Sequence, residues 1–274
     1  MKPLLILSLA LLVLFQSGRA VTAGSPASVI APLKPIWRSG TAGVLLVTGV
    51  DHPAHKWRET APRLKQILEE DQRLDVRIVE DPCFLDSAAL TNYAAVLLHF
   101  QTWEVAGPGA AARENLRQYL EQGGGLMSVH FACGAWHGEW PEFQTILGRV
   151  WHGKGPGKPQ HDPRGPFTVR IVDKTHPITR GLNNFETEDE LYTCLTGNAP
   201  IHLLADATSK MDKREHLMAF VRDYGKGRIF LTTLGHDVKA FTNACVPQLM
   251  RQGCAWTAGL DPVATDSSPT SPQR

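Results

Sequence analysis

The chain has 274 residues, and its 28 basic and 27 acidic side chains give a net charge of +1. Because acids and bases are interleaved, no basic stripe is available to follow a phosphate backbone, which argues against a nucleic-acid partner. The five cysteines form no CxxC pair and are too few for a disulfide scaffold. Their odd number leaves at least one without an intrachain partner.

Residues 1–23 have the pattern of a secretory signal peptide. Lys2 precedes a mostly apolar run over residues 4–15, and small residues follow at Ala20 and Ala23. We therefore expect export to the periplasm or the medium. A membrane-spanning helix needs about 20 apolar residues, so we expect no stable membrane insertion. A short membrane anchor is the alternative.

The rest of the chain is long enough for one domain of ordinary size, which we place at residues 42–259. Residues 24–41 are predicted to be a linker. Residues 260–274 are rich in Ser, Pro and Thr, and are predicted to be a disordered tail.

The first half of the domain alternates between two patterns. Short apolar runs predict strands over residues 43–49, 75–80, 93–100 and 126–130. Apolar residues at helical spacing predict helices over residues 62–70 and 110–122. This alternation predicts an α/β fold, in which an open, mostly parallel sheet carries helices on both faces.

The second half is less regular. Residues 151–165 contain Pro and Gly breaks without periodicity, and we predict a long loop there. Strands are predicted over residues 167–172, 201–205, 217–224 and 228–234, and a final helix over residues 244–256. A Gly-Lys-Gly connection should join the last two strands as a hairpin.

Four histidines follow predicted strands: His52, His99, His130 and His236. In open α/β sheets, ligands bind in the crevice outside the carboxyl ends of the strands. We therefore expect these side chains to face one crevice. The alternative is that each is a capping or core histidine with a local partner.

His130 is the strongest candidate among them. It lies on a strand-to-loop turn within GGGLMSVHFACGAW, followed by the small residues Ala132 and Gly134. Such a turn pushes one side chain into the crevice, as the nucleophile elbow does in α/β-hydrolases. Cys133 is close by, but no local signal indicates a lowered thiol pKa, so we assign it to packing rather than nucleophilic attack.

Acidic residues accompany the histidines near the last predicted strands. Asp237 directly follows His236, and such a pair can orient an imidazole for acid–base work or metal ligation. Asp237 could equally cap a helix. The acidic run over residues 188–190 is followed by Leu191 and Tyr192, which indicates a loop that tucks inward rather than a solvated face.

Several aromatic residues could stack on a sugar ring, although aromatic residues at these spacings more often belong to the core. They are Trp57, Trp103, Phe131, Trp136 and Trp151.

Five segments together resemble the ThuA-like (trehalose utilisation) family. They are LLVTGVDHPAHKWRETAP (45–62), GGGLMSVHFACGAW (123–136), HDPRGPF (161–167), HPITRGLNNFETEDELYTCLTG (176–197) and YGKGRIFLTTLGHD (224–237). The resemblance covers nearly all of the predicted domain in the right order. It implies a fold similar to the class I glutamine amidotransferases, which is flavodoxin-like. Those enzymes have Cys at the elbow and His after the last strand, so with His130 at the elbow we expect no amidotransferase activity.

The resemblance further implies work on a small-molecule sugar, either disaccharide-derived or a 3-keto sugar. Histidine-based acid–base chemistry would then give hydrolysis, elimination or isomerisation. The resemblance leaves open whether a divalent metal such as zinc assists, and no nucleotide cofactor is expected. A non-catalytic carbohydrate-binding protein using the same crevice is the main alternative, and a structural module is the second.

These inferences assign roles to particular residues. The predicted catalytic groups are His130 and His236, with Asp237 or Glu190 as the supporting carboxylate. The predicted metal ligands are His130, His236 and His52. The predicted substrate-binding residues are His52, Trp57, Trp103, Trp136, Asp189 and Tyr192.

Overall fold

Strands and helices alternate along the first half of the chain, as predicted. The computed structural model describes residues 37–152 and 160–262. The strands are β1 (Ala42–Val47), β2 (Leu74–Val79), β3 (Ala95–Leu98), β4 (Gly125–Val129), β5 (Val150–Trp151), β6 (Gly165–Ile171), β7 (Phe185–Asp189), β8 (Leu195–Thr196), β9 (His202–Thr208), β10 (Glu215–Tyr224) and β11 (Gly227–Thr232). The helices are α1 (Trp57–Glu69), α2 (Ala110–Glu121), α3 (Pro141–Leu147) and α4 (Cys245–Thr257), with short 3-10 helices over Pro82–Asp86, Ala88–Asn92 and His130–Gly134.

The predicted signal peptide, and most of the predicted linker and tail, lie outside the described residues. The last residues of the predicted linker are described, and Trp37 packs edge-on against Tyr93 with ring centroids 5.1 Å apart. None of the described helices is long and apolar enough to cross a membrane.

Nine strands form one sheet in the order β2-β1-β3-β4-β11-β10-β9-β6-β7. The first five pair in parallel, and their order is that of flavodoxin-like folds, with β11 in the fifth place. The other four extend this sheet by antiparallel pairing. Their hairpin-type connections explain why the second half of the sequence lacks helical periodicity.

Of two predictions for the second half, the hairpin is confirmed and the acidic loop is wrong. The predicted hairpin is present, with Tyr224 opposite Gly227 and Gly225 at a positive φ of 59°. The acidic run, however, is not a loop, because Glu188 and Asp189 end strand β7. In β7 the buried side chains alternate with exposed glutamates, so a strand is compatible with a charged sequence.

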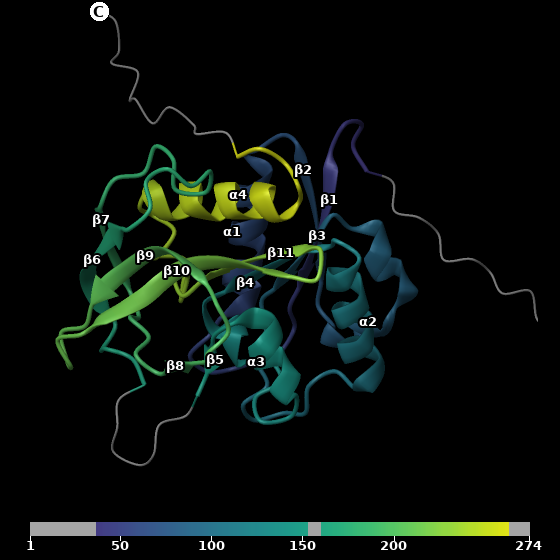
Figure 1. The fold of residues 1–274 in the computed structure, drawn as a ribbon, viewed down its shortest axis with the longest axis horizontal. Helices are drawn as coiled ribbons and strands as arrows, with labels where there is room; N and C mark the ends of the chain where they lie inside the picture. The colour runs from purple at the N-terminus through teal and green to yellow at the C-terminus, as the bar shows by residue number, and fades with distance from the viewer. Residues whose placement is uncertain (1–36, 153–159, 263–274) are drawn as a thin grey trace, which may run out of the picture. The chain divides into compact units, whose positions relative to one another are not determined.

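Both faces of the parallel strands are buried. In β1, Val44 and Leu46 belong to the core under α1 and α4, whereas Leu45 and Val47 belong to the core under α2 and α3. Figure 1 shows α4 and α1 on one side of the sheet and α2 and α3 on the other. This arrangement confirms the predicted α/β class, since strands covered on both faces read as continuous apolar runs.

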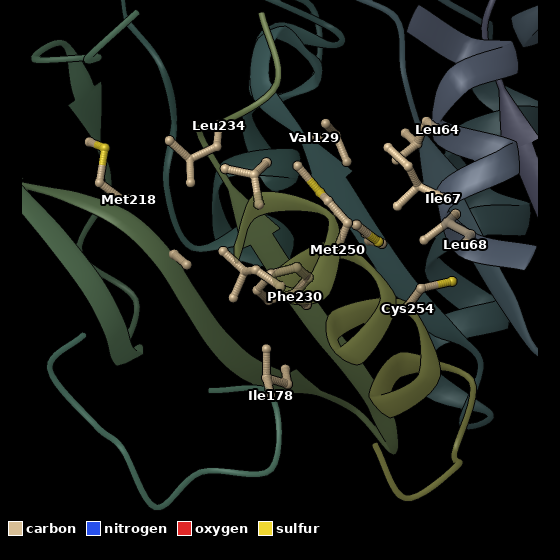
Figure 2. Close-up of a cluster of buried hydrophobic side chains, with 14 of the residues drawn as sticks. Leu64, Ile67, Leu68, Val129, Ile178, Met218, Phe230, Leu234, Met250 and Cys254 are labelled. Carbon is tan, nitrogen blue, oxygen red and sulfur yellow. The ribbon is translucent and has the colours of Figure 1, made fainter. Parts of the chain in front are cut away.

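Helix α4 lies close to the sheet because of one glycine. Phe230 of β11 lies beneath α4 in the core shown in Figure 2. A Cβ atom at Gly253 of α4 would overlap the Phe230 ring. The close approach of this helix to the sheet therefore requires a residue without a side chain.

We predict that Gly253→Ala destabilises the protein, although alanine is the better helix former. Overpacking of a buried interface costs roughly 1–3 kcal/mol, and thermal unfolding monitored by circular dichroism should show a melting temperature lowered by several degrees. Gly109→Ala is the control, because a Cβ there meets nothing within 4 Å. An unchanged or raised melting temperature for Gly253→Ala would contradict the prediction.

Candidate active site at the carboxyl edge of the sheet

His130 lies at the turn that directly follows β4. Its backbone has a positive φ of 48°, which is uncommon for a residue other than glycine and is the strained geometry of an elbow. The ring is fully buried, and its Nδ1 donates to the carbonyl oxygen of Thr233, 2.5 Å away. In the neutral ring, this proton on Nδ1 leaves the lone pair on Nε2, which points toward other ionisable groups.

Four side chains converge around that nitrogen: His55, His130, Glu190 and His236, here called the four-residue cluster. Each offers one ligand-type atom, and these atoms lie within 4.8 Å of one another. His236 Nδ1 is 3.1 Å from Glu190 Oε2 and 3.2 Å from His130 Nε2. Glu190 Oε2 is 3.6 Å from His130 Nε2. The structure thus brings together three of the four residues that the sequence predicted to be catalytic.

His55 is the member that sequence reasoning missed. It follows β1 in the same loop as His52, and its ring centroid lies 5.5 Å from that of His130 and 5.1 Å from that of His236. Both of its ring nitrogens are buried and find no hydrogen-bond partner among the described residues. The only sequence signal was the second histidine of DHPAH, which periodicity could not distinguish from the first.

His52, predicted as a metal ligand, lies one layer further out. Its ring stacks on that of His55 with centroids 5.0 Å apart, and its Nδ1 accepts the backbone N–H of Ala54 at 3.2 Å. His52 is therefore beside the cluster but not part of it.

The carboxylates of Asp189 and Asp237, which lie next to cluster residues in the sequence, do not belong to the four-residue cluster. Asp189 is fully buried and accepts the backbone N–H groups of Gly235, His236 and Glu190. Its carboxylate therefore positions the turn that carries His236 rather than contacting a ligand. Asp237, in contrast, points away from the cluster, where it forms an ion pair with Arg164 at 2.8 Å. Glu190 is the carboxylate that faces the histidines.

The electrostatics of the cluster follow from burial and from Glu190. Burial, with the nearby charges of His130 and His236, lowers the pKa of His55 to about 2, so this ring is neutral at ordinary pH. Burial opposes ionisation of Glu190, but hydrogen bonds and charge from His130 and His236 hold its pKa well below the usual range. Burial likewise lowers the pKa of His236, yet contact with Glu190 outweighs this and leaves it raised.

A pocket of about 380 Å³, here called the central pocket, opens onto the cluster. Its size lies in the range of roughly 300–1,000 Å³ that is common for small-molecule sites. Tyr192 forms part of its wall and donates its O–H to His130 Nε2 at 2.9 Å. The pocket is lined by His52, Ala54, His55, Trp103, His137, Trp151, Gln160, His161, Glu190 and Tyr192.

The structure does not bring every predicted residue to this pocket. Trp136 is 1% exposed in the α2–α3 core and donates its indole N–H to the carbonyl of Pro108. Trp57 is buried and donates to Asp51. His99 is fully buried between Thr48 and Thr60. Cys133 is also fully buried, and burial raises the pKa of its thiol, in agreement with a packing role.

The residues of the cluster fit a transition-metal ion. Nitrogen and carboxylate ligands suit zinc, and bonds of about 2.0–2.1 Å in a tetrahedral site place ligand atoms about 3.3 Å apart. The separations of 3.1, 3.2 and 3.6 Å among His236, His130 and Glu190 are close to that value. The unpartnered nitrogens of buried His55 are the second indication.

Comparisons with known proteins agree with the fold. A family model described as trehalose utilisation (ThuA) matches residues 43–257, and no curated protein matches significantly. A ThuA-like protein from Parabacteroides merdae is 27% identical over 83% of this chain and 94% of its own, with a TM-score of 0.72. One from Bacteroides uniformis is 19% identical over 82% and 94%, with a TM-score of 0.65. The glutaminase domain of Trypanosoma brucei CTPS is 13% identical over 84% and 98%, with a TM-score of 0.50.

We predict that the purified protein binds stoichiometric zinc through the four-residue cluster. His55→Ala removes one ligand and should abolish retention of the metal during dialysis, measured by mass spectrometry of the metal. His52→Ala is the matched control from the same loop and should keep the metal. Equal losses in the two variants, or a wild type that binds no transition metal, would contradict the prediction.

We also predict that His99 makes the fold sensitive to acid. Burial, with a smaller effect of the His130 charge, lowers its pKa to about 3, against about 6.5 in the unfolded chain. Below pH 6.5 the His99 imidazole is therefore protonated in the unfolded state, whereas it stays neutral in the folded state. Stability is lost as the pH falls from 6.5 toward 3, by up to about 1.4 kcal/mol per pH unit.

Urea unfolding of wild type and His99→Gln at pH 6 and pH 4.5 measures this contribution. The free energy of unfolding should fall by about 1–2 kcal/mol less in the variant than in the wild type between these pH values. Parallel pH dependences in the two proteins would show that His99 is not responsible.

Proposed function

The chain belongs to the trehalose-utilisation (ThuA) family, and from that premise we propose that it processes a disaccharide-derived 3-keto sugar in the central pocket. The observation that carries the proposal is the convergence of three imidazoles and one carboxylate, two of which, His55 and Glu190, line the central pocket. A site that only binds a sugar needs aromatic faces and hydrogen-bonding groups. It does not need a buried histidine such as His55, with both ring nitrogens unpartnered.

The four-residue cluster would hold a divalent metal such as zinc. When bound, this metal would supply Lewis-acid polarisation of the sugar's keto oxygen, which makes the neighbouring C–H more acidic. Asp189 supports the site indirectly, because its three backbone hydrogen bonds hold the turns that present Glu190 and His236.

Two histidines of the pocket wall have complementary roles, one as a base and one as a hydrogen-bond donor. His161 Nδ1 donates to the carbonyl of Asp162 at 2.8 Å, so its Nε2 has a free lone pair and can accept a proton. His52 Nδ1 accepts from Ala54, so in the neutral ring Nε2 carries the hydrogen and can donate a hydrogen bond to a sugar oxygen. The chain thus offers a base and a hydrogen-bond donor in one pocket.

These groups suffice for cleavage of a 3-keto glycoside by elimination and hydration. His161 Nε2 takes the proton from C2, the C1–C2 double bond forms, and the bond between C1 and the glycosidic oxygen breaks. The departing oxygen takes its proton from a water molecule. The hydroxide so formed adds at C1 and His161 returns its proton to C2, so the net reaction is hydrolysis. Return of the proton to the other face of C2 would instead give epimerisation.

We predict that wild type converts 3-keto-trehalose, followed by NMR of the products, and that two variants fail for different reasons. His130→Ala should lose metal and activity together, because a ligand is gone. His161→Asn should keep the metal while turnover falls by about 10²–10⁴, the usual effect of losing a general base. Treatment with EDTA should reproduce the first defect only.

Activity unaffected by both His130→Ala and His236→Ala would show that the cluster is not the site of reaction. A non-catalytic sugar-binding protein, which the aromatic walls of the pocket also suit, makes a different forecast. It predicts measurable sugar affinity in wild type without turnover of any keto glycoside, and affinity that survives both substitutions.

A further inference from the structure

A second pocket adjoins the central pocket and shares two of its lining residues, His137 and Trp151. Its volume is about 280 Å³, slightly below the range of roughly 300–1,000 Å³ that is common for whole small-molecule sites. It therefore suits one part of a ligand whose other part lies in the central pocket. We name it the Trp140 pocket after the half-buried tryptophan in its wall.

Aromatic side chains hold Trp140 in place. Its ring stacks on Phe143 with centroids 5.7 Å apart and an interplanar angle of 22°, and it meets the edge of Trp136 at 5.1 Å. Trp136 is itself anchored by the hydrogen bond to Pro108. The buried Trp136, whose predicted role was direct substrate binding, thus supports the ring that remains half exposed.

The residues that line the Trp140 pocket favour a ligand with an uncharged ring. None of its lining residues among the described part of the chain is Asp, Glu, Lys or Arg. His137, Gln144 and Thr196 supply hydrogen-bonding groups beside the indole. An aromatic face next to a few polar groups is the combination that binds the apolar face and the hydroxyl edge of a sugar.

A third pocket, which also adjoins the central pocket, has a different character. It shares His52 and His55 with the central pocket, but half of its lining residues are charged: Asp51, Lys56, Arg58 and Glu59. Asp51 and Arg58 already form an ion pair there. A neutral ring finds less to bind on that side.

We propose that the Trp140 pocket is the subsite for the leaving group, and that it binds the second pyranose ring of the substrate against Trp140. This rests on the proposed function, because the first ring is placed in the central pocket. The substrate is then an uncharged two-ring sugar whose glycosidic bond lies near His137 and Trp151, where the two pockets meet.

The test compares a two-ring ligand, 3-keto-trehalose, with a one-ring ligand, 3-keto-glucose. In Trp140→Ala, the Michaelis constant for the two-ring ligand should rise about tenfold, the loss expected when an aromatic stacking partner is removed. Binding of the one-ring ligand and the zinc content should stay unchanged, and Trp140→Phe should restore most of the affinity. Trp256→Ala is the matched control, because this half-buried tryptophan lines a separate pocket.

Equal effects on the one-ring and two-ring ligands, or no effect on either, would overturn the subsite. A loss confined to an aryl 3-keto-glucoside would overturn the assignment of a sugar ring. Should Trp140→Ala fail to fold, Gln144→Ala should raise the Michaelis constant for the two-ring ligand about twofold to tenfold, as for one lost hydrogen bond. A wild type that binds and converts neither ligand would instead overturn the proposed function.

Discussion

Parallel strands that are buried on both faces leave only their ends for polar chemistry. In β1, β3 and β4 every residue beyond the first residue of β1 is buried, so these strands offer no open face to a ligand. Polar side chains can be accommodated just after the last buried residue, where the chain turns back to the surface. His130 and His236 lie in such segments after the parallel strands β4 and β11, and the longer loop after β1 brings His55 to them.

Burial of several ionisable groups in one place requires a compensating charge, because an unpaired buried charge is strongly unfavourable. Glu190 meets this requirement for His130 and His236, while the neutral His55 is accommodated among aromatic rings. Asp189 satisfies its own carboxylate with backbone N–H groups. The two adjacent acids therefore have different functions, one in the architecture of the turns and one in the chemistry of the site.

The elbow shows how one framework supports different chemistry. The glutaminase domain of similar fold demonstrates that this sheet is compatible with distant sequences, and fold alone does not specify function. Here the strained position after β4 holds an imidazole whose tautomer is set by Thr233. Together with the adjoining pockets, it lies at the edge where we propose that a metal and the two rings of a neutral sugar bind.

The sequence by itself determined the parallel strands of the first half, the helices α1, α2 and α4, and the placement of His130 and His236 at one edge, because apolar periodicity and strand ends are local properties. It did not reveal α3 or the charged strand β7. Glu190 and Tyr192 were also found from a local pattern, an acidic run followed by apolar residues. The choice of His55 over His52, the pairing of Asp237 with Arg164, and the burial of Trp57 and Trp136 were decided only by the tertiary structure. These positions and pairings depend on the path of each loop and on which distant side chain it contacts. No periodic pattern in the sequence encodes such a contact.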